Sequence, residues 1–553
     1  MLFFFSYAFA ALVGAALAFS DTGSPLWTIG RSVTTSSGRV EGHSAANAPF
    51  VSEYLGIPYA IPPVGDLRWA APRPFRAFKN SYVNGTSFGY SCPSIGGATF
   101  QAVLSYTGNL NLTVPAIQVL DSMIGQSEDI FSEDCLTLNI WTKPQTGERK
   151  KAVMLYLHGG AFTTGTSNIR AYNGQHLADT EDIVVVTINY RLNIFGFPGA
   201  LNARNNLGLL DQRIALEWTR DNIRAFGGDP DRITVVGESA GASSVDFYSF
   251  AWTRDPIAAG FIAQSGTANV AVSARTSTEL WYSAVSELNC GNVTSNPDVV
   301  LSCMRSRDQT TILRVVAALP DFGPAVDNIT VFADNFARAS AGNFIQKPYL
   351  IGINDNEVGF FRILYEAAGY VHSEGWWVLK GQSAFNCGAA QRSKFSAAKV
   401  PTWRYRYFGD FPNLSLSPAS GAWHGSEVPM IFGTDLEIQN YTARTASQSI
   451  TASYIRSAWS AFVKDPEAGL TKQVYLSYGW PRYNADTATL VMLAYNDNGT
   501  GTSFSLPADY DFLCPWVFPL GRMLLSNSSQ SAVDMLAEFT KAMAGEVLGL
   551  FAV

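Results

Sequence analysis

The residues Gly237–Gly241 read GESAG and fit the pattern G-x-S-x-G. A serine held at a sharp turn between a strand and a helix needs small neighbours, because its strained backbone leaves no room for side chains. The β-rich run RITVVG (232–237) precedes the pattern, and the small-residue helix start AGASSVDFY (240–248) follows it. This context predicts that Ser239 is a nucleophile that attacks a carbonyl carbon.

A serine nucleophile needs a histidine base. The chain has five histidines: His43, His158, His176, His372 and His424. In the fold that carries this turn, the chain order is serine, acid and then histidine, which leaves His372 and His424. His372 stands beside two tryptophans and is equally suited to the wall of a cavity. His424 is followed by a glycine, so its ring can lie on a loop, and we expect it to be the base.

The acid that orients the base must lie between Ser239 and His424, at the end of a strand. The stretch LIGINDNEVGFF offers Asp355 and Glu357, both after a convincing strand. Either carboxylate can orient an imidazole and stabilise its positive charge. The residues alone leave this choice open.

Acyl transfer also needs donors for a developing oxyanion. The stretch LHGGAF (157–162) follows a buried strand and is poor in side chains. Its backbone N–H groups, with the one that follows the nucleophile, can point at such an oxygen. We expect the donors to be Gly160, Ala161 and Ala240, and His158 to be structural.

The elements that position these residues follow from hydrophobic patterns. Continuous apolar runs at 152–160, 182–191 and 232–237 are typical of strands buried on both faces of a parallel sheet. A helix is expected within 209–230, capped by Asp211 and ended by Gly227-Gly228, and a later strand at 347–357. Alternating strands and helices indicate an α/β fold. The stretch 360–480 is predicted to be a helical and loop subdomain over the sheet.

Composition excludes some functions. The chain has 553 residues, of which 15% are charged, and a net charge of −7 without a basic cluster. Nucleic-acid binding needs clustered Lys and Arg, so it is not expected.

Several features predict export. Residues 1–18 form an apolar run that ends in Ala16-Leu17-Ala18, which is typical of a cleaved signal peptide. Six cysteines suggest disulfides. Glycosylation sequons, expected on the surface, occur at Asn84, Asn111, Asn292, Asn328, Asn413, Asn440, Asn498 and Asn527.

Longer motifs resemble one family. FGGDPDRITVVGESAGA (226–242) and EDCLTLNIW (133–141) resemble the two signatures of the type-B carboxylesterase and lipase family, which includes cholinesterases and Candida rugosa-type fungal lipases. The resemblance implies an α/β-hydrolase fold and a Ser–Glu–His triad. Carried over by motif, the acid is Glu357, with Ser239 and His424. The family usually has glycine directly after the acid, where this chain has Val358.

The resemblance also implies the disulfides Cys92–Cys135, Cys290–Cys303 and Cys387–Cys514, and one domain over 19–553. The 92–135 loop is where this family keeps a lid or a choline-binding tryptophan. Residues 93–134 contain no tryptophan, so a choline ester is not expected. Ile117, Leu120 and Ile124 recur at helical spacing there, consistent with either an amphipathic lid or ordinary packing. Only 67 residues separate Glu357 from His424, fewer than in cholinesterases, so we expect a differently shaped cavity.

These observations predict a secreted serine carboxylic-ester hydrolase that needs no metal or cofactor. Its substrate is expected to be a small-molecule or lipid ester. The alternatives are a lipase for longer-chain acylglycerols, in transient contact with a lipid interface, and a non-catalytic adhesion-type relative. Nothing in the sequence indicates the oligomeric state.

Overall fold

The computed structural model describes residues 28–106, 108–126, 128–144, 150–268, 276–319, 322–438, 442–472, 478–497 and 503–517. The predicted signal peptide (1–18) and the sequons at Asn440, Asn498 and Asn527 lie outside the described residues.

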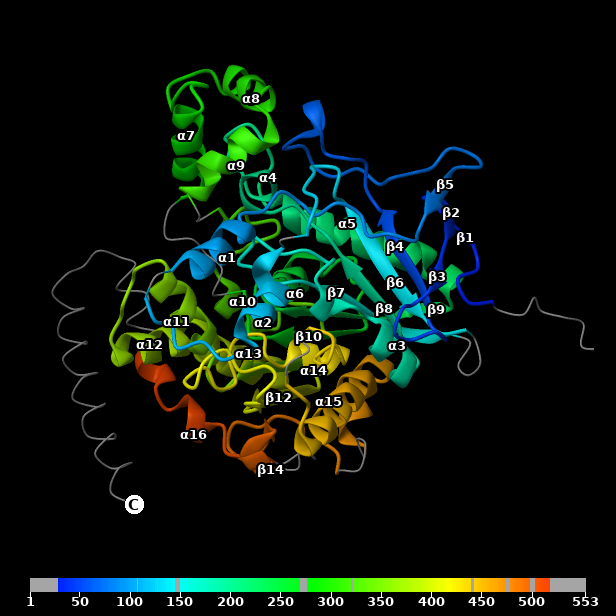
Figure 1. Ribbon diagram of the computed structural model, residues 1–553, viewed down its shortest axis with the longest axis vertical. Coiled ribbons are helices and arrows are strands. Elements are labelled where there is room, and N and C mark those ends of the chain that lie inside the picture. The colour runs from blue at the N-terminus through cyan, green and yellow to red at the C-terminus, as the bar shows by residue number, and fades with distance from the viewer. Residues whose placement is uncertain are drawn as a thin grey trace, which may run out of the picture.

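A large central sheet organises the fold (Figure 1). Within the described residues it has eleven strands in the order β14-β13-β12-β11-β10-β9-β7-β8-β6-β4-β3. The seven strands from β13 to β8 are parallel, and the strands at both edges are antiparallel. The bounds are β3 (His43–Ser44), β4 (Ser52–Pro58), β6 (Thr137–Thr142), β7 (Lys151–Leu157), β8 (Val184–Ile188), β9 (Gly228–Glu238), β10 (Gly260–Gln264), β11 (Tyr349–Asn354), β12 (Thr402–Tyr407), β13 (Leu490–Leu493) and β14 (Ser503–Ser505).

The predicted apolar runs form the centre of this sheet as β7, β8 and β9. Successive side chains of a strand point to opposite faces. On β7, Met154 and Tyr156 therefore enter one core cluster, while Val153 and Leu155 enter the other. Burial on both faces explains why these runs are apolar throughout instead of alternating.

Helices cover both faces of the sheet (Figure 1). The helices α3, α14 and α15 contribute to one core cluster, and α5, α6 and α13 to the other. The stretch 360–480 supplies helices but also β12, which joins the main sheet. The bounds are α1 (Gly96–Ser105), α2 (Ala116–Leu120), α3 (Gln175–Glu181), α4 (Asn193–Gly196), α5 (Leu207–Asn222), α6 (Ala240–Ala251), α7 (Ser277–Glu287), α8 (Pro297–Arg305), α9 (Gln309–Ala317), α10 (Asn335–Ala341), α11 (Val358–Ala367), α12 (Glu374–Gly381), α13 (Cys387–Ala397), α14 (Val428–Phe432), α15 (Ala446–Lys464) and α16 (Ala508–Asp511).

Two smaller units flank the sheet. The strands β1 (Val33–Thr35), β2 (Gly38–Glu41) and β5 (Tyr82–Asn84) form a separate small sheet. The helices α7, α8 and α9 form a lobe at the top of Figure 1, and the core cluster around Trp281 joins them to α4 and the start of α5. Short 3₁₀ turns occupy Gly65–Leu67, Arg170–Tyr172, Ile223–Phe226, Gly469–Thr471 and Tyr495–Asp497, and π-helical turns occupy Asp121–Gly125 and Gln382–Asn386.

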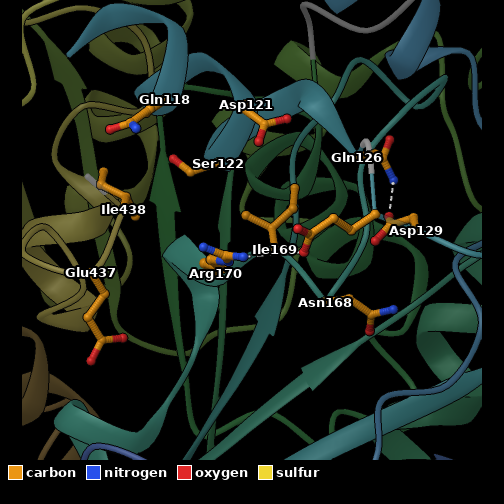
Figure 2. A pocket seen from close by; sticks show the side chains of 11 residues that line it. Gln118, Asp121, Ser122, Gln126, Asp129, Asn168, Ile169, Arg170, Glu437 and Ile438 are labelled. Atoms are coloured by element: carbon orange, nitrogen blue, oxygen red, sulfur yellow. Dashed lines mark hydrogen bonds and ion pairs between the residues drawn. The ribbon is translucent and has the colours of Figure 1, made fainter. Parts of the chain in front are cut away.

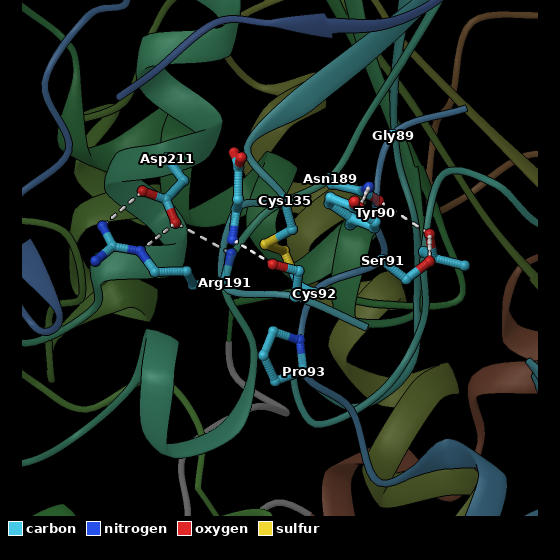
Figure 3. The surroundings of a disulfide bond; sticks show 12 residues. Gly89, Tyr90, Ser91, Cys92, Pro93, Cys135, Asn189, Arg191 and Asp211 are labelled. Atoms are coloured by element: carbon cyan, nitrogen blue, oxygen red, sulfur yellow. Dashed lines mark hydrogen bonds and ion pairs between the residues drawn. A yellow bond between two sulfur atoms is a disulfide. The ribbon is translucent and has the colours of Figure 1, made fainter. Parts of the chain in front are cut away.

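The expected cap of α5 is wrong. The helix begins at Leu207 after Asn206, which adopts a positive φ of 56°. Asp211 lies inside the helix, fully buried, and its carboxylate accepts hydrogen bonds from Arg191 at 2.7 and 2.8 Å (Figure 3). A buried carboxylate requires such a partner, and this long-range ion pair outweighs the local capping preference. The expected end at Gly227-Gly228 lies a few residues beyond the α-helix: α5 ends at Asn222 and continues as a 3₁₀ turn over Ile223–Phe226, which Gly227 ends with a φ of 85°.

Three disulfides join the cysteines in the pairs implied by the family resemblance. Cys92–Cys135 closes the segment 92–135, called the disulfide loop below (Figure 3). Cys290–Cys303 lies in the α7–α9 lobe, and Cys387–Cys514 joins the start of α13 to a segment beyond α16.

The structure separates the described sequons. Asn84, Asn111, Asn292 and Asn328 are exposed. Asn413 is 0% exposed, and its side-chain amide donates to the carbonyl oxygen of Asp435 at 3.2 Å. The expectation that this sequon lies on the surface is therefore wrong, because the buried amide leaves no room for a glycan in the folded protein.

The expected class, a mostly parallel sheet flanked by helices, is confirmed. None of the helices within the described residues is both long and apolar enough to span a membrane.

Candidate active site

A sharp turn between β9 and α6 carries Ser239. The strand ends at Glu238, the helix begins at Ala240, and Ser239 between them has φ 57° and ψ −121°. Non-glycine residues rarely hold a positive φ unless their surroundings fix it. The N–H of Ser239 donates to the carbonyl oxygen of Gln264 on β10 at 2.8 Å, which ties the turn to the neighbouring strand.

The glycines around the serine are required by close backbone approach. A Cβ at Gly237 would lie 2.4 Å from the backbone of Gly241. A Cβ at Gly241 would lie 2.0 Å from the carbonyl oxygen of Leu157, and one at Gly266 would lie 2.4 Å from that of Ser239. The G-x-S-x-G pattern thus reflects the packing of this turn, called the elbow below, against β7 and β10.

The structure brings His424 and Glu357 together. The Nδ1 of His424 lies 2.6 Å from Glu357 Oε2, and the other carboxylate oxygen accepts from the N–H of Asn354 at 2.7 Å. Both side chains are buried. A carboxylate in this position makes Nδ1 the protonated nitrogen and leaves Nε2 as the basic one.

The two alternatives from the sequence lie elsewhere. Asp355 points to β12, where it pairs with Arg406 at 2.7 Å and is half exposed. His372 stacks on Trp376, with 3.9 Å between the ring centroids, on the turn before α12. Among the described residues, the cavity that contains Ser239 is lined by His424 and not by His372.

Two more buried glutamates surround His424. Glu238 Oε1 lies 3.2 Å from His424 Nε2, and Glu427 is held by Gln264 at 2.9 Å and by Asn354 at 2.6 Å. Burial raises the pKa of Glu238 to about 8, and burial also raises the pKa of Glu427. Burial by itself lowers the pKa of His424, but the carboxylates of Glu238 and Glu357 outweigh it and raise this pKa to about 9.

The loop after β7 passes beside the elbow. In residues 157–165, called the glycine loop below, φ is positive at Gly160, Ala161, Phe162 and Gly165. Among the described residues, no hydrogen bond uses the N–H groups of Gly160 and Ala161, nor that of Ala240. Free N–H groups next to a serine can bind an oxyanion.

His158, at the start of this loop, has a structural environment. Its ring stacks on Tyr190 at 4.4 Å, and Tyr190 donates its hydroxyl to the carbonyl oxygen of His158. Burial lowers the pKa of His158 to about 4, so its imidazole stays neutral at physiological pH.

A cavity of about 220 Å³ opens above Ser239 and His424. Backbone of the glycine loop forms one side. Apolar side chains form most of the rest: Met123, Ile124, Tyr172, Phe360, Phe361, Leu364 and Trp423. The cavity therefore suits an apolar group attached to a carbonyl that lies between the elbow and the glycine loop.

The sequence did not reveal every residue at this site. Glu238 was visible only as the variable position of the motif, and its burial beside His424 depends on β9 packing. Phe360 and Phe361 on α11 follow soon after Glu357 in the chain, but only the orientation of that helix shows that they line the cavity. Met123 comes from the disulfide loop, and its terminal carbon would lie 3.3 Å from a Cβ at Gly425.

Comparisons with known proteins agree with this geometry. Residues 30–375 match the carboxylesterase family. A chlorogenic acid esterase of Aspergillus niger is 35% identical over 487 residues, 84% of this chain and 90% of that protein. Secreted lipase 5 of Gibberella zeae is 32% identical over 518 residues, with coverages of 86% and 92%. A cholinesterase of Mus musculus is 34% identical over 351 residues, with coverages of 61% and 55%. Together with the sheet, the family match confirms the expected α/β-hydrolase fold.

Proposed function

We propose that this carboxylic ester hydrolase, which belongs to the carboxylesterase family, works through an acyl-enzyme formed on Ser239. The observation that carries this proposal is the constellation around one cavity. Ser239 and His424 both line it, and Glu357 lies 2.6 Å from the far nitrogen of the same imidazole. Because the chain is a carboxylic ester hydrolase, we do not propose the alternative of a non-catalytic adhesion-type protein.

The mechanism has two steps. Ser239 attacks the ester carbonyl while His424 Nε2 takes the hydroxyl proton, and the N–H groups of Gly160, Ala161 and Ala240 bind the oxyanion. Protonated His424 then gives its proton to the leaving alcohol. Water, activated by the same imidazole, attacks the acyl carbonyl, and collapse of the second tetrahedral intermediate frees Ser239. Glu357 orients the ring and stabilises its positive charge throughout.

Covalent labelling tests the nucleophile. An organophosphonate should label the purified protein once, on the peptide that contains Ser239. The Ser239→Ala variant should take no label and should lose at least about 10⁴-fold in kcat on a p-nitrophenyl ester. An unlabelled wild-type protein, or a Ser239→Ala variant of normal activity, would contradict the proposal.

We propose esters with an apolar acyl group of short to medium length as the substrate class. The cavity of about 220 Å³ and its aromatic wall support this size and polarity. We expect choline esters to be poor substrates, because the disulfide loop supplies no tryptophan for a quaternary ammonium. A series of p-nitrophenyl esters from acetate to palmitate, together with chlorogenic acid and a choline ester, measures this selectivity through kcat/KM.

A lipase is the second candidate. The disulfide loop borders the cavity and exposes the apolar side chains Leu104, Val114, Ile117 and Ile130, of which Val114 is 79% exposed. Exposed apolar groups beside a site favour contact with a lipid surface. On the inner side of the loop, Leu120 is buried and Ile124 lines the cavity. Activity confined to emulsified long-chain esters would identify a lipase, and activity confined to soluble esters an esterase.

We also propose that the protein is secreted after loss of residues 1–18 and is glycosylated at the exposed sequons. The relative named as a secreted lipase supports this location. N-terminal sequencing of the exported protein should begin at Phe19. Enzymatic removal of glycans should shift the mass of peptides containing Asn84, Asn111, Asn292 and Asn328, and not that of the Asn413 peptide.

A further inference from the structure

The glycine loop needs support from outside itself. Ala161 and Phe162 both have positive φ, at 53° and 62°, which costs about 1–2 kcal/mol for each non-glycine residue. Within the loop, the N–H groups of Thr163 and Thr164 donate to the carbonyl oxygen of Gly160 at 3.0 Å. Those bonds shape the loop, but they do not fix its place relative to Ser239.

One buried amide from the disulfide loop reaches the end of the glycine loop. Gln126 is 8% exposed and follows the π-helical turn Asp121–Gly125. Its side-chain oxygen lies 2.9 Å from the hydroxyl of Thr164 and 3.3 Å from the N–H of Gly165. It also lies 2.8 Å from the hydroxyl of Ser94. An amide oxygen has two lone pairs, so these three donors more than fill its capacity.

The same amide is fixed on its other side. Its nitrogen donates to Asp129 Oδ2 at 2.9 Å (Figure 2). The hydroxyl of Ser91 lies 2.8 Å from the same carboxylate oxygen. Gly96 leaves room for this arrangement, since a Cβ there would lie 2.0 Å from the hydroxyl of Thr164. The amide nitrogen and the amide oxygen of Gln126 are thus both hydrogen-bonded, which fixes the orientation of the side chain.

We propose that Gln126 is a positioning residue for ester hydrolysis, which holds the Thr164–Gly165 end of the glycine loop and thereby aims the N–H groups of Gly160 and Ala161. This inference rests on the proposed function of those N–H groups as oxyanion donors. Such donors are effective only when they are preorganised at the position of the developing charge. A displacement of about 1 Å costs about 10²-fold in rate.

Gln126 also lines a second, polar cavity of about 270 Å³ on the outer side of the π-helical turn (Figure 2). Water in that cavity can hydrogen-bond the groups that a substitution leaves unpaired. Loss of the amide is therefore expected to affect the position of the loop more than the folding of the chain.

The test compares isosteric variants. Gln126→Met removes the amide at similar volume, and we expect kcat and kcat/KM to fall together by about 10–100-fold with KM nearly unchanged. The affinity of a trifluoromethyl ketone, which forms an oxyanion on the serine, should fall by the same factor. Gln175→Met is the matched control, because this buried amide binds Asn47 and Glu437 instead. The control should keep wild-type kcat.

Thr164 gives an independent readout if Gln126→Met does not fold. Thr164→Val, which loses the hydroxyl, should lower kcat. Thr164→Ser, which keeps the hydroxyl, should have a kcat close to that of the wild type. A folded Gln126→Met with kcat within about two-fold of wild type would overturn the proposal, as would an equal loss in Gln175→Met. Organophosphonate labelling of the wild-type protein distinguishes failure of the proposed function from failure of this inference. If Ser239 takes no label, the proposed function is refuted. If Ser239 is labelled but Gln126→Met keeps the kcat of the wild type, only the role of Gln126 is refuted.

Discussion

The elbow at Ser239 and the glycine loop at residues 157–165 both hold strained backbone, but they are held by different means. The elbow packs closely against β7 and the end of β10: a Cβ at Gly241 would lie 2.0 Å from the carbonyl oxygen of Leu157, and one at Gly266 would lie 2.4 Å from that of Ser239. The glycine loop leaves the sheet after β7 and is held by hydrogen bonds. The N–H of Asn193 donates to the carbonyl oxygen of Phe162 at 2.7 Å, and the side chain of Gln126 holds the Thr164–Gly165 end. The nucleophile is therefore positioned by main-chain packing, and the oxyanion donors by hydrogen bonds, some of which come from a side chain in a distant loop.

This difference implies different responses to mutation. Packing of backbone against backbone cannot relax without moving a strand, so damage at the elbow should appear in stability. A loop held by hydrogen bonds can shift while the core stays intact, so damage there should appear in rate.

The largest effect is expected from Glu357→Gln. Loss of the carboxylate disfavours the imidazolium that forms after attack, so kcat/KM should fall by about 10³–10⁴-fold. Steady-state kinetics on a soluble ester measures this, with circular dichroism to show that the fold is kept. Asp355→Asn is the control, since its partner is Arg406, and it should stay within about two-fold of wild type. The reverse ranking would assign the acid to Asp355.

A pair of glycine variants tests the contrast directly. Gly241→Ala places a Cβ against the carbonyl oxygen of Leu157, and should lower the free energy of unfolding by at least about 3 kcal/mol. Gly160→Ala places a Cβ 2.2 Å from the carbonyl oxygen of Thr164 and 3.0 Å from its side chain, both within the glycine loop, and should lower kcat by about 10²–10³-fold with a smaller loss of stability. Chemical denaturation and kinetics on both variants measure the two effects.

Gly375→Ala is the control for this pair, because the space around that helical position is open and its substitution should be neutral or slightly stabilising. If Gly160→Ala lost as much stability as Gly241→Ala, the distinction between the two regions would be wrong.

The same contrast explains what the sequence could predict. The elbow was predictable because its requirements are local: a β-rich run, a serine between small residues and a helix start. Physical reasoning left Asp355 and Glu357 equal, since both follow β11. The structure separates them through contacts from distant segments, with His424 next to Glu357 and Arg406 next to Asp355.

Tertiary contacts also explain why sequence patterns gave the wrong position or role for some residues and missed others. Asn413 carries a valid sequon but is buried beneath the loop that follows α14. Asp211 has a capping residue type but pairs with Arg191. Gln126 shows no pattern at all, because its importance comes from partners that lie up to 39 residues away in the chain.

The smallest effect concerns pH and the second carboxylate beside His424. The base must be neutral, so kcat/KM should rise with pH and level off near the raised pKa of His424, about 9. Glu238→Gln removes one of the three carboxylates that raise this pKa, so the rising limb should move to lower pH by about one unit. A pH–kcat/KM profile of both proteins measures the shift, and an unmoved limb would show that Glu238 does not act on His424.

Stability should change with pH in the opposite direction to activity. Between the ordinary pKa of Glu238, 4.5, and its folded value of about 8, the folded protein holds a proton that the unfolded chain has released. His424 adds a second such proton between 6.5 and about 9. The free energy of unfolding therefore falls as pH rises through these windows, because the native state binds more protons than the unfolded state. Glu238→Gln should flatten this slope, most clearly between pH 4.5 and 8, while Gln175→Met should leave it unchanged. Denaturation midpoints across this range test whether the buried carboxylate that raises the pKa of the base also makes the folded protein less stable at the pH where it is most active.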